Sequence, residues 1–563
     1  MAGTVAGLAV GAVIGVTGGY LGAPGKTKTE TATQTNTSTE TQTQTSTQLS
    51  TATLTSTETL TATTTQVQTV NPLIPSSWDY SADVVVMGAG TTGLSAAIEA
   101  VTAGVKVIVL EKEPSSLLAD SGHCAGTLSA AGTTYQAAKG ITDSPDIYYA
   151  ELTGPGTDAR INPALARLIA DNGAPNIAWL TQQGITWQTY CPLLDGQSTA
   201  PRLMAAVPNS QTYPSTLNAS ATAKGVTFLY NTPVTGLIRD PTNGVIGVTA
   251  KTATKVINVK ASRAVVLAAG DASANIKFLE MFGTSPSYYA TLPSAACPGD
   301  TGDAIIAAMA IGGAPICLDN VPGPQLKWDV VNTHINPDTS YGYAANSTNV
   351  NAKLPGYTYQ PAIMSYAIWV NNAGNRFTNE IGSTTAADTL AQPNSTAYMV
   401  FDSVPAKANV VMHISAGHTY FNEWMAQGVL AQANTLSDLA TTLGISASGL
   451  SATVTKWNGY CTASPAKDLD FGRSILGPGI SVGPFYGMKS SMYSTQQSNG
   501  TLNLSFPDLH VVDEAGKPIP RLYAAGDSGK GGTMAAGHGT HMMWTFTSGR
   551  IAGGNGAKET PWS

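Results

Sequence analysis

Three glycines in the spacing G-x-G-x-x-G, Gly88, Gly90 and Gly93, form the clearest chemical motif of the chain. They follow an apolar, β-branched run at residues 83–87, which predicts a buried strand, and precede a small-residue run at 94–100, which predicts a helix. In such a unit the first glycine permits a tight turn, the second admits a pyrophosphate, and the third lets helix and strand pack closely. The N–H groups at the helix start then bind phosphate. The motif therefore predicts a dinucleotide site.

A second apolar run at residues 105–110 ends on an acid, Glu111, which lies 18 residues after Gly93. This run predicts the second strand of a βαβ unit, and an acid at this distance accepts hydrogen bonds from a ribose. Strand, glycine turn, helix, strand and acid thus stand in the order that dinucleotide binding requires.

Two later segments decide which dinucleotide we expect. Residues 264–270 (AVVLAAG) and 521–527 (RLYAAGD) are apolar runs that end in small residues. Together with VVVMGAGTTGLSAAIEA, CPGDTGDAIIAAMAIGGAP, WVNNAGNRFTNE and VGPFYGM, they resemble the flavoprotein family of fumarate reductases, succinate dehydrogenase flavoprotein subunits and 3-ketosteroid dehydrogenases. The resemblance covers about residues 82–557 and implies that the cofactor is FAD.

The resemblance also implies which residues hold FAD. Asp527 stands where an acid contacts the ribityl chain, and residues 537–540 open a helix whose N-terminus faces the N1–C2=O edge of the flavin. His123 lies two residues too early to match the flavinyl histidine of the succinate dehydrogenase branch, so covalent attachment there is only the alternative to a loop that passes the ring and the phosphates. The predicted cofactor-binding residues are Gly88, Ala89, Gly90, Thr92, Gly93, Glu111, Lys112, Ser121, Gly122, Ala131, Gly132, Val234, Ala269, Gly270, Asp303, Asp527, Thr540 and His541.

We predict an α/β fold: a Rossmann-like FAD-binding domain with an inserted α+β capping domain, preceded by an apolar N-terminal segment and a Thr-rich stalk. The predicted parts are a signal or anchor segment (1–24), the stalk (25–78), the first part of the FAD-binding domain (79–275), the cap (276–400) and the second part of the FAD-binding domain (401–563).

In this family the flavin exchanges a hydride with a C–C bond next to a carbonyl. Fumarate reductases hold the two substrate carboxylates with Arg and His, and an Arg protonates carbon. At the matching places this chain has residues 361–367 without an Arg, Cys297, residues 494–498, and Ala536 or Gly537. A pocket without such cations cannot offset the desolvation of two carboxylates, so we predict a small neutral substrate and not fumarate.

Several polar side chains remain as candidates for activating such a substrate. The ketosteroid branch implies Tyr hydroxyls and backbone N–H groups in that role. The predicted catalytic residues are Tyr366, Tyr486, His538 and His541, with Tyr493, Gln496 and Cys297 as further candidates. An external electron donor or acceptor is expected as partner. The alternatives are a surface protein that keeps the flavoprotein fold without catalysis, and an electron-transfer subunit.

The N-terminal region predicts export. Residues 1–24 are uncharged and rich in Gly and Ala, and residues 26–70 are so rich in Thr that they cannot bury apolar surface. We expect a cell-surface protein, and residues 1–24 could tether it to the membrane. The alternative interpretation of the Thr-rich residues 26–70 is a plain disordered linker. Six N-x-S/T triplets, at Asn36, Asn218, Asn346, Asn394, Asn499 and Asn503, suit a glycosylated surface.

Composition narrows the choice of partners. Charged residues make up 11% of the chain, and the formal net charge is −7. Nucleic-acid binding would require a basic face, so we exclude it. The five cysteines form no C-x-x-C pair, which excludes an iron–sulfur or c-type haem module here, and we predict no metal site.

Overall fold

The computed structural model describes the chain from Ile74 to Trp562 with interruptions. The residues left out of this range are 123, 125, 156, 188–198, 208–209, 284–291, 293–295, 320–324, 329–366, 381–384, 405–424, 426–427, 429, 475, 494–499 and 535–538. The predicted N-terminal segment and the stalk up to residue 73 lie outside the described residues. Among the helices that are described, none is long and apolar enough to cross a bilayer.

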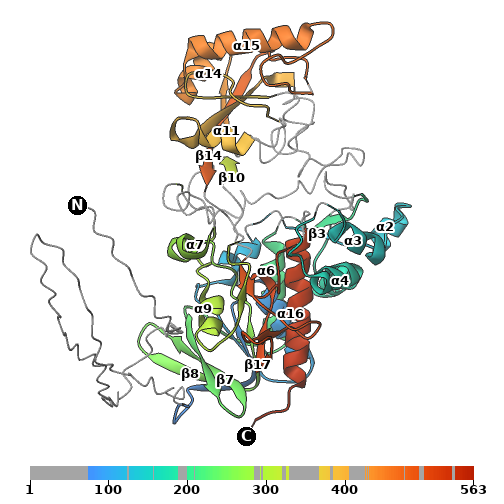
Figure 1. Ribbon diagram of the computed structural model, residues 1–563, viewed down its shortest axis with the longest axis vertical. Coiled ribbons are helices and arrows are strands. Elements are labelled where there is room, and N and C mark those ends of the chain that lie inside the picture. The colour runs from blue at the N-terminus through green and yellow to red at the C-terminus, as the bar shows by residue number, and fades with distance from the viewer. Residues whose placement is uncertain are drawn as a thin grey trace, which may run out of the picture. The chain divides into compact units, whose positions relative to one another are not determined.

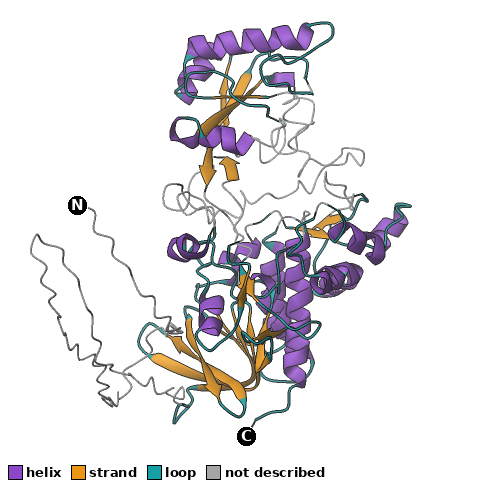
Figure 2. Ribbon diagram, viewed as in Figure 1, coloured by secondary structure: helices purple, strands orange, loops and turns teal. Residues whose placement is uncertain are grey.

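Eight strands form the first sheet, in the order β16-β17-β8-β1-β2-β5, with β7 also on β8 and β6 on β7 (Figure 2). Strand β1 pairs in parallel with β2 and β8, and β17 pairs in parallel with β8, as expected for a Rossmann-like domain. The strands are β1 (Tyr80–Met87), β2 (Val107–Leu110), β5 (Thr227–Leu229), β6 (Val234–Asp240), β7 (Gly244–Lys251), β8 (Val256–Leu267), β16 (His510–Val512) and β17 (Pro518–Ala524).

Short elements and helices surround this sheet (Figure 1). The helices are α1 (Thr91–Thr102), α2 (Thr134–Ala138), α3 (Pro145–Leu152), α4 (Pro163–Asp171), α5 (Gly173–Gln182), α6 (Thr212–Ala223), α7 (Ile276–Phe282), α9 (Asp303–Met309) and α16 (Thr540–Lys558). The small strands are β3 (Thr127–Ser129), β4 (Leu203–Ala205), β9 (Pro315–Ile316) and β15 (Thr501–Leu502), and the 3₁₀ turns include η2 (Asp120–Gly122) and η4 (Gly526–Ser528).

The N-terminal βαβ unit forms where the sequence predicts it. The apolar run that ends β1 is fully buried because helices and neighbouring strands cover both faces of a parallel sheet. Helix α1 packs directly on α16, and two glycines of α16 allow this: a Cβ at Gly549 would lie 2.3 Å from the Thr92 carbonyl oxygen, and one at Gly553 would lie 2.1 Å from that of Ala96. Small residues thus bring the first and last helices of the domain into backbone contact.

A second sheet has the order β10-β14-β12-β11, with β13 also paired to β14. Helices α14 and α15 pack on each other and contribute Leu439, Leu450 and Trp457 to an apolar cluster that also includes Ile368 and Val400 of the sheet. The elements are β10 (Gln325–Trp328), β11 (Ile368–Val370), α11 (Thr385–Leu390), β12 (Thr396–Phe401), β13 (Leu430–Ala433), α14 (Leu436–Leu443), α15 (Ala447–Thr462) and β14 (Phe485–Tyr493).

Strand pairing corrects the predicted domain boundaries. The predicted end of the cap, Val400, falls inside β12, and β12 pairs with β14 from Thr396 to Phe401. Residues up to Tyr493 therefore belong to the second sheet. At the other end, α9 contributes Ala304 and Ile305 to the core of the first sheet, so the predicted cap start at residue 276 is too early.

The start of the folded part also shifts by a few residues. Trp78 packs its ring against that of Trp562, with centroids 6.4 Å apart. The Asp79 carboxylate accepts hydrogen bonds from the Asn258 N–H and from the Lys255 ammonium. Trp78 thus belongs to the first domain and not to the predicted stalk.

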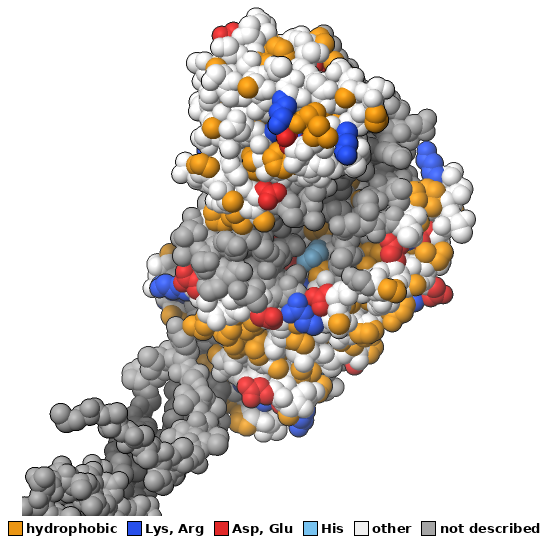
Figure 3. Space-filling model, turned by 45° about the horizontal axis from the view of Figure 1, so that its top comes forward, with side chains coloured by type: hydrophobic (Ala, Val, Ile, Leu, Met, Phe, Trp, Pro, Cys, Tyr) orange, Lys and Arg blue, Asp and Glu red, His pale blue; other side chains and the backbone are white. Residues whose placement is uncertain are grey.

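The described surface carries few charges. In the view of Figure 3, basic and acidic side chains are scattered over the coloured part of the face, and they form no broad basic area there.

Buried ion pairs stabilise the unit built on the second sheet. The Arg376 guanidinium donates to Glu380 and Asp468, and Arg473 donates to Glu380. The side chains of Glu380, Asp468 and Arg473 are fully buried. Burial opposes ionisation of Asp468, but the hydrogen bonds from Arg376 and the Arg473 N–H outweigh it and lower its pKa to about 2.

The helix contact yields a matched pair of substitutions. Gly553→Ala should destabilise the protein by about 1–3 kcal/mol, because the new methyl group would overlap the Ala96 carbonyl. Gly554→Ala should instead stabilise it by up to about 1 kcal/mol, because a Cβ there meets nothing within 4 Å and alanine favours the helix. Denaturant unfolding gives the change in the free energy of unfolding for each variant. Equal changes in the two variants would contradict the packing of α16 on α1.

The lowered pKa of Asp468 predicts how stability depends on pH. The ionised form contributes above the ordinary pKa of an aspartate, and this contribution is lost as the pH falls toward 2. The stability gap between the protein and Asp468→Asn should therefore shrink by about 2 kcal/mol between pH 6 and pH 2. Asp470→Asn is the control, since it breaks only an exposed ion pair with Lys456 and should have little effect.

Candidate functional site

A cavity lies at the end of the first sheet where the glycine turn joins β1 to α1. It is lined by the turn, the ends of β2 and β8, the η2 turn, the loop before α9, and the first turns of α16. Of the predicted cofactor residues, those that line it are Gly88, Gly90, Thr92, Glu111, Lys112, Ser121, Val234, Ala269, Gly270, Asp303, Asp527 and His541.

The three motif glycines serve different contacts. A Cβ at Gly88, which has φ +102°, would lie 2.5 Å from the Ala268 carbonyl oxygen, and a Cβ at Gly93 would lie 2.0 Å from that of Gly88. At Gly90 the nearest atoms to a Cβ are Ala119 Cβ at 3.5 Å and Ser121 Oγ at 3.8 Å. Gly88 and Gly93 are thus required by the fold, whereas a side chain at Gly90 would enter the cavity.

The start of α1 is prepared for an anion. Gly90 is its N-cap and has no side chain to cap the helix, and Gly90, Thr91 and Thr92 line the cavity. A helix start of this kind offers N–H groups to a ligand. The Thr91 N–H donates to Ser121 Oγ at 3.2 Å, which ties the predicted residue Ser121 to this turn. The arrangement fits a pyrophosphate.

Glu111 has a second task that the sequence does not reveal. One carboxylate oxygen accepts the Ala89 N–H at 2.6 Å and the other accepts the Glu113 N–H at 2.8 Å. Burial raises the pKa of Glu111 despite these hydrogen bonds. Because each oxygen has a further lone pair, the carboxylate can hold the glycine turn and still accept from ribose hydroxyls. Ala89 supports the site through this backbone bond.

Lys112 and Asp303 join two walls of the cavity. The Lys112 ammonium donates to Asp303 at 2.8 Å and to Thr301 Oγ1 at 2.6 Å. Thr301 was missed in the sequence analysis, although the P-G-D-T-G-D stretch that contains it is one of the motifs of the family resemblance.

Asp527 lies between two basic side chains. The Lys530 ammonium is fully buried and lies 2.8 Å from Asp527 Oδ1, and His541 Nδ1 lies 3.7 Å from the same oxygen. Burial disfavours the charged form of Asp527, but Lys530 and His541 outweigh it and hold its pKa well below the usual range. Sequence analysis did not single out Lys530, because nothing in the sequence showed that its ammonium is buried.

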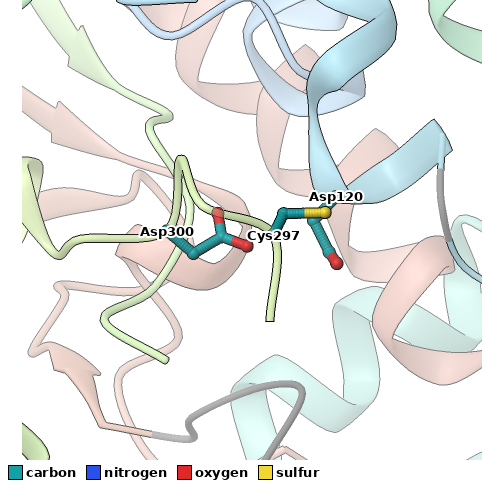
Figure 4. A group of neighbouring side chains, drawn as sticks. All are labelled: Asp120, Cys297 and Asp300. Carbon is teal, nitrogen blue, oxygen red and sulfur yellow. The ribbon is translucent and has the colours of Figure 1, made fainter. Parts of the chain in front are cut away.

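Three further polar groups gather on the cavity wall: Asp120, Cys297 and Asp300 (Figure 4). Their potential metal-binding atoms all lie within 4.8 Å of one another. Burial raises the pKa of the Cys297 thiol and of the Asp300 carboxyl, and both then favour their protonated forms. A metal needs the thiolate and the carboxylate, so this group is a poor metal site as it stands.

Other predicted residues lie away from the cavity lining. Gly122 is packed against Gln211, whose amide donates to its carbonyl, and Thr540 is a buried residue at the start of α16. The backbone of Ala131 lies against Gly173 at the start of α5, and neither Ala131 nor its neighbour Gly132 is among the residues that line the cavity.

The catalytic candidates are only partly described. Tyr486 is a buried residue of β14 in the second sheet, where its ring stacks on Phe401 with centroids 5.4 Å apart. Its catalytic role stays a prediction. Of the two predicted catalytic residues that the structure describes, Tyr486 and His541, His541 lines the cavity. Tyr366, His538, Gln496, His123 and the side chain of Tyr493 lie outside the described part.

Residues 83–540 match the family model of the FAD binding domain, which is more than half of the chain, and the protein belongs to this family. It is an FAD-dependent oxidoreductase, and its relatives act on CH–CH bonds. It is 28% identical to the urocanate reductase of Eggerthella lenta over 495 residues, which are 86% of this chain and 76% of that protein.

Two solved structures share the fold. One is the open conformation of a flavocytochrome c3 fumarate reductase, with a TM-score of 0.72, 24% identity, and 85% and 79% of the two chains covered. The other is the 3-ketosteroid-Δ4-(5α)-dehydrogenase of Rhodococcus jostii RHA1 in complex with 4-androstene-3,17-dione, with a TM-score of 0.59, 23% identity, and 86% and 99% covered. Both confirm the predicted fold class for the folded region.

The glycine turn allows cofactor binding to be separated from folding. Gly90→Val should leave a folded but colourless protein, because a Cβ there makes only ordinary contacts and the rest of the side chain would enter the cavity where the pyrophosphate fits. Gly93→Ala should lower stability and soluble yield, because its Cβ would collide with the Gly88 carbonyl. Flavin absorbance and melting temperature, measured on both, test the assignment. A soluble yellow Gly90→Val protein would refute it.

Proposed function

We propose that this flavoprotein oxidises or reduces a C–C bond next to a carbonyl in a small neutral molecule, and that fumarate is not its substrate. We further propose that it works outside the cytoplasm and exchanges electrons with an external donor or acceptor. The observation that carries the substrate proposal is the small number of basic side chains on the described part of the cavity wall.

Acidic side chains outnumber basic ones on the described part of this wall. Seven acidic side chains line it, against one lysine and His541. The lysine, Lys112, is already paired with Asp303. The acids are Glu111, Glu113, Asp120, Asp271, Asp300, Asp303 and Asp527.

Such a wall favours a substrate without carboxylates. An anion brought into this cavity loses its hydration and meets the negative charge of the acids that are ionised, such as Asp527, so it needs compensating cations. FAD meets this requirement at its pyrophosphate through the N–H groups of the α1 start. Cys297, which stands where the fumarate-reducing branch of the family has a His, supplies no charge, since burial keeps its thiol protonated.

The residues of this chain have separable tasks in the proposed reaction. The glycine turn binds the pyrophosphate, Glu111 accepts from the ribose, and Asp527 accepts from the ribityl chain. When bound, FAD supplies the acceptor or donor for the hydride. His541, in the first turn of α16, lines the cavity beside Asp527 and can donate a hydrogen bond there, at a helix end whose dipole stabilises negative charge.

Substrate charge is tested with the purified FAD-loaded protein. Fumarate and succinate at millimolar concentration should leave the flavin spectrum unchanged, and reduced protein should not be reoxidised by fumarate. Each missing charged hydrogen bond is worth about 1.5–3 kcal/mol, so two weaken binding more than a hundredfold. Neutral enones and 3-ketosteroids should perturb the flavin bands and turn over.

The outcomes separate the alternatives. Measurable fumarate reduction would refute the neutral-substrate proposal. Flavin that is bleached by a chemical reductant but reoxidised by no enone, ketosteroid or dicarboxylate would favour a protein that keeps the fold without this catalysis.

A further inference from the structure

Lys530 is a fully buried ammonium that the proposed reaction does not use. Its side chain has no exposed area, and it ranks among the largest fully buried side chains in the described part of the protein. Its Nζ lies 2.8 Å from Asp527 Oδ1, whereas Lys530 itself is not among the residues that line the cavity. Lys530 therefore contacts the cofactor site only by way of Asp527, which does line the cavity.

The turn that carries both residues is fixed on all sides. The Trp544 indole N–H donates to the carbonyls of Gly526 and Gly529, and the Gly526 N–H donates to Ser548 Oγ at 2.8 Å. The Lys530 N–H donates to Thr501 Oγ1 at 3.0 Å. These bonds fix the backbone of the turn, and within it the Lys530 ammonium lies 2.8 Å from the Asp527 carboxylate.

The contact between Lys530 and Asp527 matters because of the charges that it brings together. Asp527 is one of seven acids on the described cavity wall, and FAD carries two negative phosphates and gains further negative charge when the flavin is reduced. An uncompensated carboxylate at this place would oppose both binding and reduction. The ammonium behind it cancels that charge while leaving the carboxylate oxygens able to accept hydrogen bonds.

We propose that Lys530 is a positioning residue for the cofactor: it holds Asp527 in place and neutralises its charge, and thereby raises both the affinity for FAD and the reduction potential of the bound flavin. The proposal rests on FAD binding alone and not on the choice of substrate. The lowered pKa of Asp527 agrees with the geometry.

A series of variants that remove one charge or both tests the proposed role of Lys530. Lys530→Met keeps the length of the side chain and removes its charge, and it should weaken FAD binding at least tenfold. It should also make the flavin harder to reduce by about tenfold in the equilibrium constant, which is about 30 mV for a two-electron couple. Asp527→Asn should shift the potential in the opposite direction, because it leaves the ammonium uncompensated.

The double variant Lys530→Met/Asp527→Asn decides between charge and packing. It removes both charges, so its potential and FAD affinity should return toward those of the unaltered protein. Lys224→Met, which removes an exposed lysine outside the cavity, is the control and should change neither quantity. The readouts are titration of the apo-protein with FAD and a redox titration of the flavin, and neither needs a substrate.

Two results would overturn the proposal. One is a Lys530→Met protein whose flavin potential and FAD affinity equal those of the unaltered protein. The other is a double variant no closer to the unaltered protein than Lys530→Met is, which would mean that Lys530 serves packing only. If Lys530→Met is too unstable to purify, the double variant should still fold and bind FAD, and its failure to do so would refute charge compensation.

Discussion

Backbone contact between the first and last helices is the constraint on which the site depends. Helix α1 lies so close to β1 that Gly93 faces the Gly88 carbonyl, and so close to α16 that Gly549 and Gly553 face the carbonyls of Thr92 and Ala96. A Cβ at any of these places would force the elements apart. The close packing brings the starts of α1 and α16 to one cavity, although about 450 residues separate the two segments in the sequence.

Two helix N-termini at one cavity explain how so acidic a wall can bind an anionic cofactor. Backbone N–H groups and helix dipoles provide positive potential without a charged side chain. The acids then serve as hydrogen-bond acceptors: Glu111 secures the turn through the Ala89 N–H, and Asp527 is compensated by Lys530.

The second sheet is an independent hydrophobic unit with its own buried charges. Arg376 and Arg473 lie within 5 Å of the Trp457 ring centroid and pair with Glu380 and Asp468. These side chains come from two segments about 90 residues apart, so the unit depends on long-range contacts that form only when the whole sheet is assembled.

The sequence by itself determined the βαβ unit, the glycine turn and the acid at the end of β2, because these follow from local patterns: an apolar strand, glycines at fixed spacing, and an acid at a fixed distance. The choice of FAD over other dinucleotides followed from the family resemblance of segments spread along the chain. The sequence misplaced the cap boundaries, because β12 pairs with β14, about 90 residues later, and no local pattern predicts that pairing.

The sequence also missed the hydrogen bond from the Ala89 N–H to Glu111 and the buried Lys530 ammonium next to Asp527. Lys530 is only three residues from Asp527, yet a lysine in a glycine-rich turn is equally compatible with solvent. Only the tertiary structure decided that it is buried, because burial depends on Thr501 and Trp544, which other parts of the chain bring to this turn.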